Sequence, residues 1–94
     1  MIIEIHTPGT QVKERITDYI KEKLMELHRR GTSISNARIY FWQQVKTQNG
    51  NKACEVDLTL SGDSLFIYRK SYSYEQAMSE VLEELGKKLG IRDK

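Results

Sequence analysis

Apolar positions along the chain change their period several times, and each change marks an element. Residues 2–6 carry β-branched side chains and predict a short strand, which ends at Thr7-Pro8-Gly9 because proline cannot donate to a ladder. Between 12 and 27 the apolar residues recur three and four positions apart, which predicts an amphipathic helix. Thr10 is expected as its N-cap and Gly31 as its C′ residue.

The second half of the chain returns to a period of two. Residues 46–51 form a polar hairpin loop around an Asn-Gly turn signal. Ser73 followed by Gln76 matches a capping box, which predicts the start of a second helix. The strands are expected at 37–45, 54–60 and 65–72, and the second helix has its apolar stripe at Ala77, Met78, Val81, Leu82, Leu85 and Leu89.

Strand alternation assigns side chains to two faces of one sheet. The inward set is Ala37, Ile39, Phe41, Cys54, Val56, Leu58 and Leu60, and the outward set is Arg38, Tyr40, Trp42, Glu55, Asp57 and Thr59. Each helix has a single apolar stripe, so both should cover the same face. The pattern predicts an α+β fold of order β-α-β-β-β-α, with a four-stranded sheet in a single domain spanning 1–94.

Length and composition narrow the class of protein. A chain of 94 residues buries only about 60–65% of its unfolded surface, so one helix layer on one sheet leaves little room for a deep catalytic cavity. The single cysteine excludes an intramolecular disulfide and indicates a reducing compartment. No apolar run approaches the roughly 20 residues of a membrane span, and the opening residues, with an acid at Glu4, do not form a signal peptide. We expect a cytoplasmic protein with no membrane partner.

Motifs for catalysis and metal binding are missing. His6, His28 and Cys54 lack the spacing of metal ligands or of a nucleophile with its base, and no glycine-rich phosphate loop occurs. Carboxylates are plentiful but lie on predicted solvent faces, where their pKa values cannot be raised for acid catalysis. The sequence predicts no enzyme, no catalytic residue, no metal, no cofactor and no small-molecule substrate.

The 15 lysines and arginines against 13 acids give a net charge of only +2. On the first helix, an acidic stripe and a flank without acids face solvent on different sides. This segregation is either a chance feature of a solvated face or a surface kept clear for an anionic partner. The stripe is Glu14, Asp18, Glu22 and Glu26, and the flank is Lys13, Thr17, Lys21 and His28.

Other cations lie outside this flank, both within the first helix and around the second. Lys23 lies within the apolar stripe, where a lysine can bury its stem and carry its ammonium to the sheet edge, with or without a ligand. Lys87 and Lys88 belong to a basic tip of the second helix, which helix electrostatics alone also explains. Arg69-Lys70 leads into that helix. We hypothesise that the flank, this pair and the tip merge into one patch.

Four aromatic residues are expected on the open face of the sheet: Tyr40, Trp42, Phe66 and Tyr68. Aromatic side chains on an open sheet can stack single-stranded bases. A simple meander, however, places Glu55 and Asp57 between them, and carboxylates repel phosphates. Cross-strand packing or a weak homodimer through these four residues is the favoured interpretation.

With these elements assigned, the chain resembles the bacterial ribosome hibernation factors. This family includes hibernation promoting factor, ribosome-associated inhibitor, ribosomal subunit interface protein and sigma-factor modulation protein. The resemblance is most specific over 53–66, where Cys54-Glu55-Val56 and Gly62-Asp63-Ser64-Leu65-Phe66 are similar to the family pattern C-E-I…P-G-x-D-L-F. Tyr74-Glu75-Gln76-Ala77 is similar to its F-E-E-A helix start, and residues 5–9 resemble the opening of some members.

The resemblance implies a double-stranded-RNA-binding-domain-like fold that binds ribosomal RNA of the small subunit near the decoding centre. It implies silencing of ribosomes in stationary phase or stress. Lys23, Arg69, Lys70 and Lys87 match basic positions of the family. The chain departs from the family at Glu26, Glu84 and Ile91, where basic residues are usual. It resembles the short form, without a C-terminal dimerisation domain.

We therefore expect a translation inhibitor whose lysines and arginines neutralise phosphates of ribosomal RNA. Two alternatives stay open: a protein-interaction module that uses the aromatic face and ignores RNA, and a family member that has lost ribosome binding. The expected RNA-binding residues are Lys21, Lys23, Arg30, Arg69, Lys70, Lys87, Lys88 and Arg92.

Overall fold

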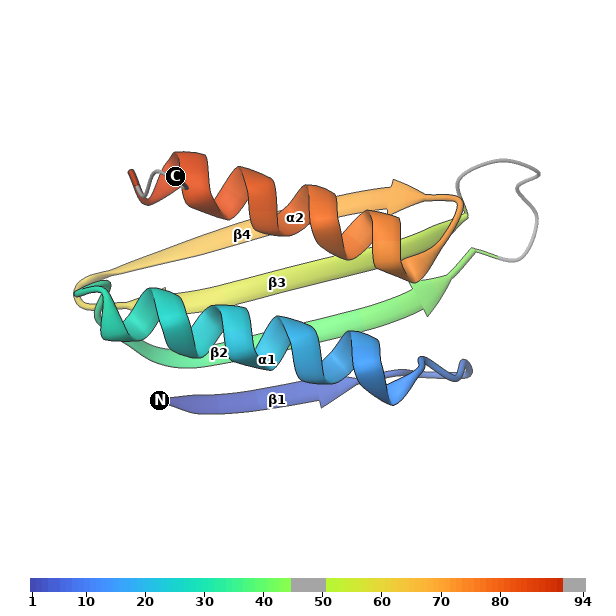
Figure 1. The fold of residues 1–94 in the computed structure, drawn as a ribbon, viewed down its shortest axis with the longest axis horizontal. Coiled ribbons are helices and arrows are strands. Elements are labelled where there is room, and N and C mark those ends of the chain that lie inside the picture. The colour runs from blue at the N-terminus through green and yellow to red at the C-terminus, as the bar shows by residue number, and fades with distance from the viewer. Residues whose placement is uncertain (45–50, 91–94) are drawn as a thin grey trace.

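A computed structural model describes residues 1–44 and 51–90, and these fold into one sheet and two helices (Figure 1). The chain order is β-α-β-β-β-α, which confirms the predicted α+β class. The elements are β1 (Ile2–His6), α1 (Glu14–Arg29), β2 (Ile34–Gln43), β3 (Lys52–Leu60), β4 (Asp63–Ser71) and α2 (Tyr74–Lys88).

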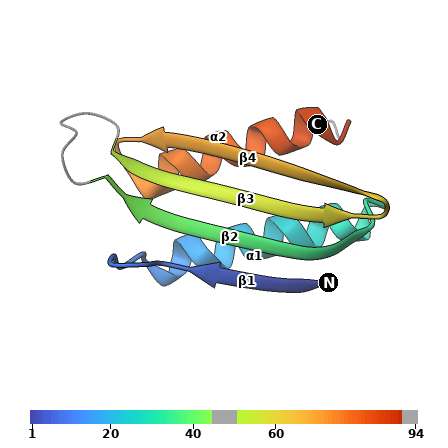
Figure 2. The same cartoon turned by 180° about the vertical axis from the view of Figure 1, so that it is seen from behind.

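The sheet has the order β1-β2-β3-β4, and both helices pack on one of its faces. β1 pairs parallel to β2, while β2, β3 and β4 form an antiparallel meander. The two helices run in the same direction, so both begin at one end of the sheet and end at the other (Figure 1). The view from behind shows the second face without any helix over it (Figure 2). This leaves two distinct surfaces: the groove between the helices and the open sheet face.

The core lies between the helices and the sheet, as the alternation predicted. Ile39, Phe41 and Leu58 from the strands are fully buried, and Ile20 and Leu85 meet them from the helices. The ring of Phe41 packs edge-on against that of Tyr74, with centroids 5.7 Å apart. Each buried large apolar side chain contributes roughly 1.5–3 kcal/mol relative to exposure, so this single layer accounts for most of the stability.

The start of α1 differs from the prediction. The helix begins at Glu14 with Lys13 as its N-cap residue, and no side chain caps it. Thr10 is wrong as the N-cap, because its hydroxyl lies 2.8 Å from the Tyr74 hydroxyl, where it ties the loop before α1 to the start of α2. The predicted C′ glycine is confirmed: Gly31 has φ of 100°, a conformation that residues with a Cβ rarely adopt.

The other boundaries shift by up to three residues. β2 begins at Ile34 rather than 37, β3 at Lys52 rather than 54, and β4 at Asp63 rather than 65, because backbone pairing continues beyond the apolar runs. The capping box is confirmed on its serine side: Ser73 accepts a hydrogen bond from the Gln76 amide at 3.1 Å. Most of the predicted loop at 46–51 lies outside the described residues.

Candidate nucleic-acid interface

A groove of about 480 Å³ lies between α1 and α2 on the solvent side of the helix layer. Its floor is formed by apolar side chains such as Leu27 and Leu82, which pack against the core. Tyr19 and Gly86 also line it. We refer to this hollow, which runs along the middle and C-terminal parts of both helices, as the inter-helix groove.

Three of the predicted RNA-binding residues line the inter-helix groove: Lys23, Arg30 and Lys87. They come from two helices, so only the packing of α1 on α2 brings them together. Glu26 lies among them, with its carboxylate 3.5 Å from both Lys23 Nζ and Arg30 Nη2. Glu83 also lines the groove, so its positive charge is partly offset by acids of the same chain.

The position of Lys23 corrects one expectation. Its ammonium does not run to the sheet edge, because it lies at the groove, 5.4 Å from the centre of the Tyr19 ring and 3.5 Å from Glu26. The side chain keeps 42% of its surface exposed. Its stem therefore covers apolar surface while its charge faces solvent.

A second group of predicted cations gathers around Glu84, away from the groove. Arg69 Nη2 lies 3.2 Å from this carboxylate, and Lys88 Nζ lies 3.8 Å from it. Arg69 also donates to the carbonyl of Tyr68 at 2.9 Å. Glu84, one of the residues at which the chain departs from the family pattern, thus holds two of the cations that were expected to bind RNA.

The merged basic patch is wrong, because Arg69 and Lys70 lie on opposite faces of the sheet. Arg69 pairs in register with Cys54 on the helix side, whereas Lys70 pairs with Ala53 on the open side, as adjacent strand residues must. Lys70 donates to the side-chain carbonyl of Gln44 at 2.8 Å.

The predicted flank is also separate from the groove. Lys21 precedes Lys23 by two residues, which is about 200° around a helix, so it points away from α2. Arg92 lies outside the described residues, as does Ile91. Of the eight predicted residues, three share the inter-helix groove, two surround Glu84, and Lys21 and Lys70 stand apart.

At the other end of the helices lies a hollow of about 360 Å³ that sequence reasoning missed as a site. Lys13 and Arg15 line it from the start of α1, and Lys52 lines it from β3. We refer to it as the N-terminal hollow. Arg15 Nη1 lies 3.1 Å from Glu75, and this guanidinium lowers the pKa of that carboxyl. No sequence signal joins Lys52 to Lys13, because the residues are 39 positions apart and meet only in the fold.

The four aromatics lie on the open sheet face as predicted, two on β2 and two on β4. β3 lies between these two strands (Figure 2). The rings of Trp42 and Tyr68 stack across β3 with centroids 5.9 Å apart, over the small Ala53, which is fully buried. The Trp42 indole donates to Glu55 at 2.7 Å. Phe66 is the most exposed of the four, at 60%. Most of this aromatic surface is therefore already used in cross-strand packing.

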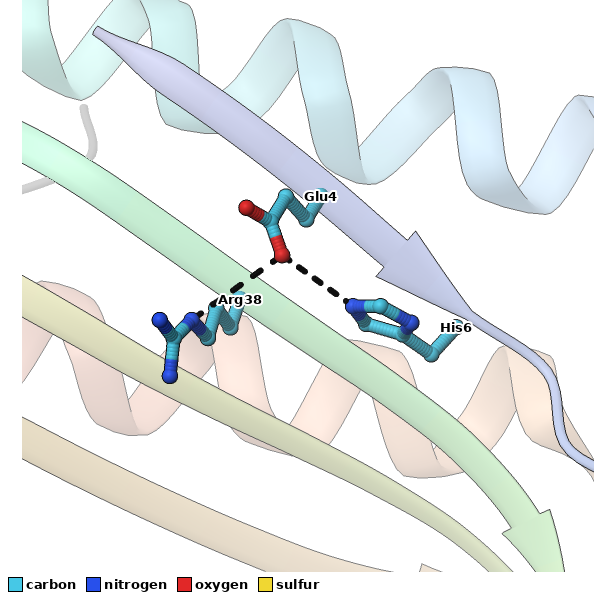
Figure 3. A network of polar contacts seen from close by, with 3 residues as sticks. All are labelled: Glu4, His6 and Arg38. Carbon is cyan, nitrogen blue, oxygen red and sulfur yellow. Dashed lines mark hydrogen bonds and ion pairs between the residues drawn. The ribbon is translucent and has the colours of Figure 1, made fainter.

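Charged side chains complete the open face near β1 (Figure 3). Glu4 lies 3.2 Å from the His6 ring nitrogen and 3.9 Å from Arg38, and all three side chains are close to half exposed. The His6 ring stacks on Tyr40 at a centroid distance of 4.8 Å. Because carboxylates lie beside these aromatic rings, this face is less suited to an RNA phosphate than the helix side.

Cys54 is a buried core residue, as predicted. Its side chain is fully buried, and burial raises the pKa of the thiol to about 12. Among residues 1–44 and 51–90, no group of three or more His, Cys, Asp or Glu side chains is arranged to hold a metal ion. Neither helix in the same part of the chain is long and apolar enough to cross a membrane.

Comparison with known proteins identifies the family. The solved structure of a ribosomal subunit interface protein from Coxiella burnetii superposes with a TM-score of 0.79 at 17% identity, over 96% of this chain and 94% of that one. The Thermus thermophilus Protein Y N-terminal domain superposes with a TM-score of 0.76 at 18% identity, over 95% of this chain and 96% of that one. These likenesses support the fold. A comparison with curated proteins found no match. The family model for sigma 54 modulation protein / S30EA ribosomal protein matches residues 3–91, and the chain therefore belongs to this family.

Proposed function

We propose that this protein is a ribosome-associated translation inhibitor that binds small-subunit ribosomal RNA near the decoding centre. In this proposal it acts in the cytoplasm under stress or in stationary phase, where it silences ribosomes. Membership in a family described as S30EA ribosomal protein supports association with ribosomes. The fold also matches a protein named for the ribosomal subunit interface.

The observation that carries the RNA-binding step is the inter-helix groove. Its three cations, Lys23, Arg30 and Lys87, lie on the same side of the molecule, and their charges face solvent. Lysine and arginine bind nucleic acids chiefly by neutralising phosphates and releasing counterions, without a preformed base-reading pocket. This chemistry needs exposed cations on a rigid surface, which two helices packed on a sheet supply.

Inhibition in this proposal is steric. A protein with a Cα radius of gyration of 13.0 Å that occupies the decoding region excludes the messenger and transfer RNA that bind there. No bond is made or broken, so the strength of inhibition follows from affinity alone. Glu26 and Glu84 hold cations within the chain, which predicts weaker binding with a shallower salt dependence than that of a surface with unpaired cations, because fewer phosphates are neutralised.

Co-sedimentation with small ribosomal subunits at two salt concentrations tests the proposal. We expect salt-sensitive binding by the wild type and a loss of at least tenfold in affinity for Lys23→Gln with Lys87→Gln. Each phosphate contact removed should reduce the slope of log K against log salt by about 0.7–0.9.

The matched control is Arg29→Gln with Arg38→Gln, which also removes two charges. Neither residue lines the inter-helix groove or the N-terminal hollow, and Arg38 lies on the open sheet face. We expect it to bind like the wild type. No association of the wild type at either salt concentration would contradict the proposed function, and equal losses in both variants would contradict its assignment to the groove.

The alternative of a weak homodimer through Tyr40, Trp42, Phe66 and Tyr68 stays a prediction, supported by the 60% exposure of Phe66. Sedimentation velocity of the wild type and Trp42→Ala tests it. A concentration-dependent dimer that the substitution weakens supports self-association. A monomer in both samples removes the alternative.

A further inference from the structure

The N-terminal hollow concentrates positive charge more strongly than the inter-helix groove does. Among residues 1–44 and 51–90, three cations line it against one carboxylate, that of Glu75. Three cations also line the inter-helix groove, but against the two carboxylates of Glu26 and Glu83. The N-terminal hollow is lined from the starts of α1 and α2, and the inter-helix groove from positions further along the same two helices. Both helices run in the same direction (Figure 1). The proposed function uses only the inter-helix groove.

The cations of the N-terminal hollow come from separate segments and are held by the fold. Lys52, on β3, carries its ammonium to 5.9 Å from the centre of the Tyr74 ring, which is buried. Arg15 is held by Glu75 at 3.1 Å. The hydrogen bond between Thr10 and Tyr74 at 2.8 Å fixes the loop that leads to Lys13. The hollow is therefore anchored on both helices and on the sheet.

The polar groups around these cations suit an anion. The hollow is also lined by Thr10, Ser73 and Gln43, whose side chains can donate hydrogen bonds. In addition, the Lys13 side chain makes no capping hydrogen bond at the start of α1, and among the described residues no side chain accepts from the first amides of that helix. A phosphate oxygen carries the negative charge and the acceptor lone pairs that match cations, hydroxyls and amides together.

We propose that Lys13, Arg15 and Lys52 form a second contact for a phosphate of the RNA backbone. The bound RNA would then follow the helix layer from the inter-helix groove to the N-terminal hollow. Arg15 and Arg30 are 15 residues apart on α1, which corresponds to about 22 Å along a helix axis. This inference rests on the proposed function, because it names further residues of the same RNA-binding surface.

The first test compares two charge-matched double variants in small-subunit binding across a salt series. Lys13→Gln with Lys52→Gln leaves the Arg15–Glu75 pair intact, and Arg29→Gln with Arg38→Gln is the control. We expect the first variant to lower the slope of log K against log salt by about 0.7–0.9, because both lysines contact the same phosphate, and the control to leave it unchanged. Thermal unfolding of both variants verifies that each is folded.

The second test reports where the RNA lies. Because Cys54 is fully buried, a cysteine introduced on the surface is the thiol that an added reagent modifies. Lys13→Cys carrying a tethered iron chelate should cleave small-subunit RNA at defined positions when hydroxyl radicals are generated. Arg38→Cys on the open sheet face is the matched control and should give no such cleavage.

The outcomes separate this inference from the proposed function. If the wild type does not bind small subunits, the proposed function fails. If the wild type binds but Lys13→Gln with Lys52→Gln keeps the full salt slope, only the second contact is overturned. A reduced slope without RNA cleavage from position 13 also overturns it, because the hollow then contacts an acidic protein segment instead.

Discussion

The two faces of the sheet receive neighbouring residues of the same strands but have opposite characters. The face under the helices buries Ile39, Phe41 and Leu58 completely. On the open face, Trp42 and Glu55 from the same strands remain partly exposed and hydrogen-bond to each other. The cations proposed to bind RNA lie on the side of this first face, on or beside the helices that cover it, with Lys52 coming from β3.

This difference shows that the partners of a charged strand residue depend on which face of the sheet its side chain occupies. Arg69 and Lys70 are adjacent in sequence, yet Arg69 lies near Glu84 on α2 and Lys70 near Gln44 on the open face. The net charge of +2 does not describe either face, because acids lie on both: Glu4 and Glu55 project from the open face, while Glu26 and Glu84 lie among the cations of the helix side.

The largest expected effect is on the free energy of unfolding, and it distinguishes two phenylalanines, one on each face of the sheet. Phe41 is fully buried and Phe66 is 60% exposed. Phe41→Ala should lower the free energy of unfolding by about 3–5 kcal/mol, because it leaves a cavity beside Tyr74, whereas Phe66→Ala should change it by less than about 0.5 kcal/mol. Urea denaturation measures both. Similar losses would contradict the assignment of the two faces.

The second effect concerns pH and the buried thiol of Cys54. Its pKa is raised from 9.0 to about 12, so between these values the unfolded chain loses this proton while the folded chain keeps it. Its contribution to the free energy of unfolding should therefore fall by about 1.4 kcal/mol per pH unit above pH 9, and is constant below that. Cys54→Ala is the control, because it lacks the titrating group. The same pH dependence in both proteins would show that other groups cause it.

A smaller effect is expected on the open face. Trp42→Ala removes the ring stack with Tyr68 and the hydrogen bond to Glu55, which should cost about 1 kcal/mol of stability. Binding to small ribosomal subunits should stay within twofold of the wild type, because the proposed RNA surface lies on the helix side. A large loss of ribosome binding in a folded Trp42→Ala variant would contradict the helix-side assignment and indicate that the open face binds the ribosome.

The smallest effect should be a gain of affinity on the helix side. Glu84→Gln removes the carboxylate that holds Arg69 and Lys88, so both cations become available to phosphates. We expect binding to small subunits about two- to fivefold tighter, consistent with the 0.2–1 kcal/mol of exposed ion pairs. Glu80→Gln is the matched control on the same helix, since Glu80 has no ion pair among the described residues. Equal gains of affinity in the two variants would indicate that the change in net charge, and not the loss of the ion pairs, causes the effect.

Local patterns were enough to predict the elements and their faces. The alternation in β3 placed Cys54 and Val56 in the core, and the serine of the capping box placed the start of α2. The start of α1 could not be predicted in this way, because Thr10 bonds to Tyr74, a residue 64 positions away. A capping residue is decided by competition between local and distant partners, and sequence shows only the local ones.

The candidate site was predicted only in part for the same reason. Helical spacing marked Lys23 as unusual, and the resemblance pointed to Lys87, but their shared groove required the packing of α1 on α2. Nothing in the sequence grouped Lys52 with Lys13 and Arg15, since side chains from a strand and a helix meet only after the sheet has formed. Expected partners also changed, because Glu26 and Glu84 bind cations that were assigned to RNA.

The sequence by itself determined the order of the elements, the face that each apolar residue takes and the family resemblance. These follow from hydrophobic periodicity, turn chemistry and short motifs, which act over a few residues. Only the tertiary structure decided which charges lie together. It joined Lys23 and Arg30 to Lys87 and gathered Lys13, Arg15 and Lys52, whereas strand alternation alone places Arg69 and Lys70 on opposite faces. Electrostatic interactions depend on distance in space, and distances between segments are fixed only when the core packs.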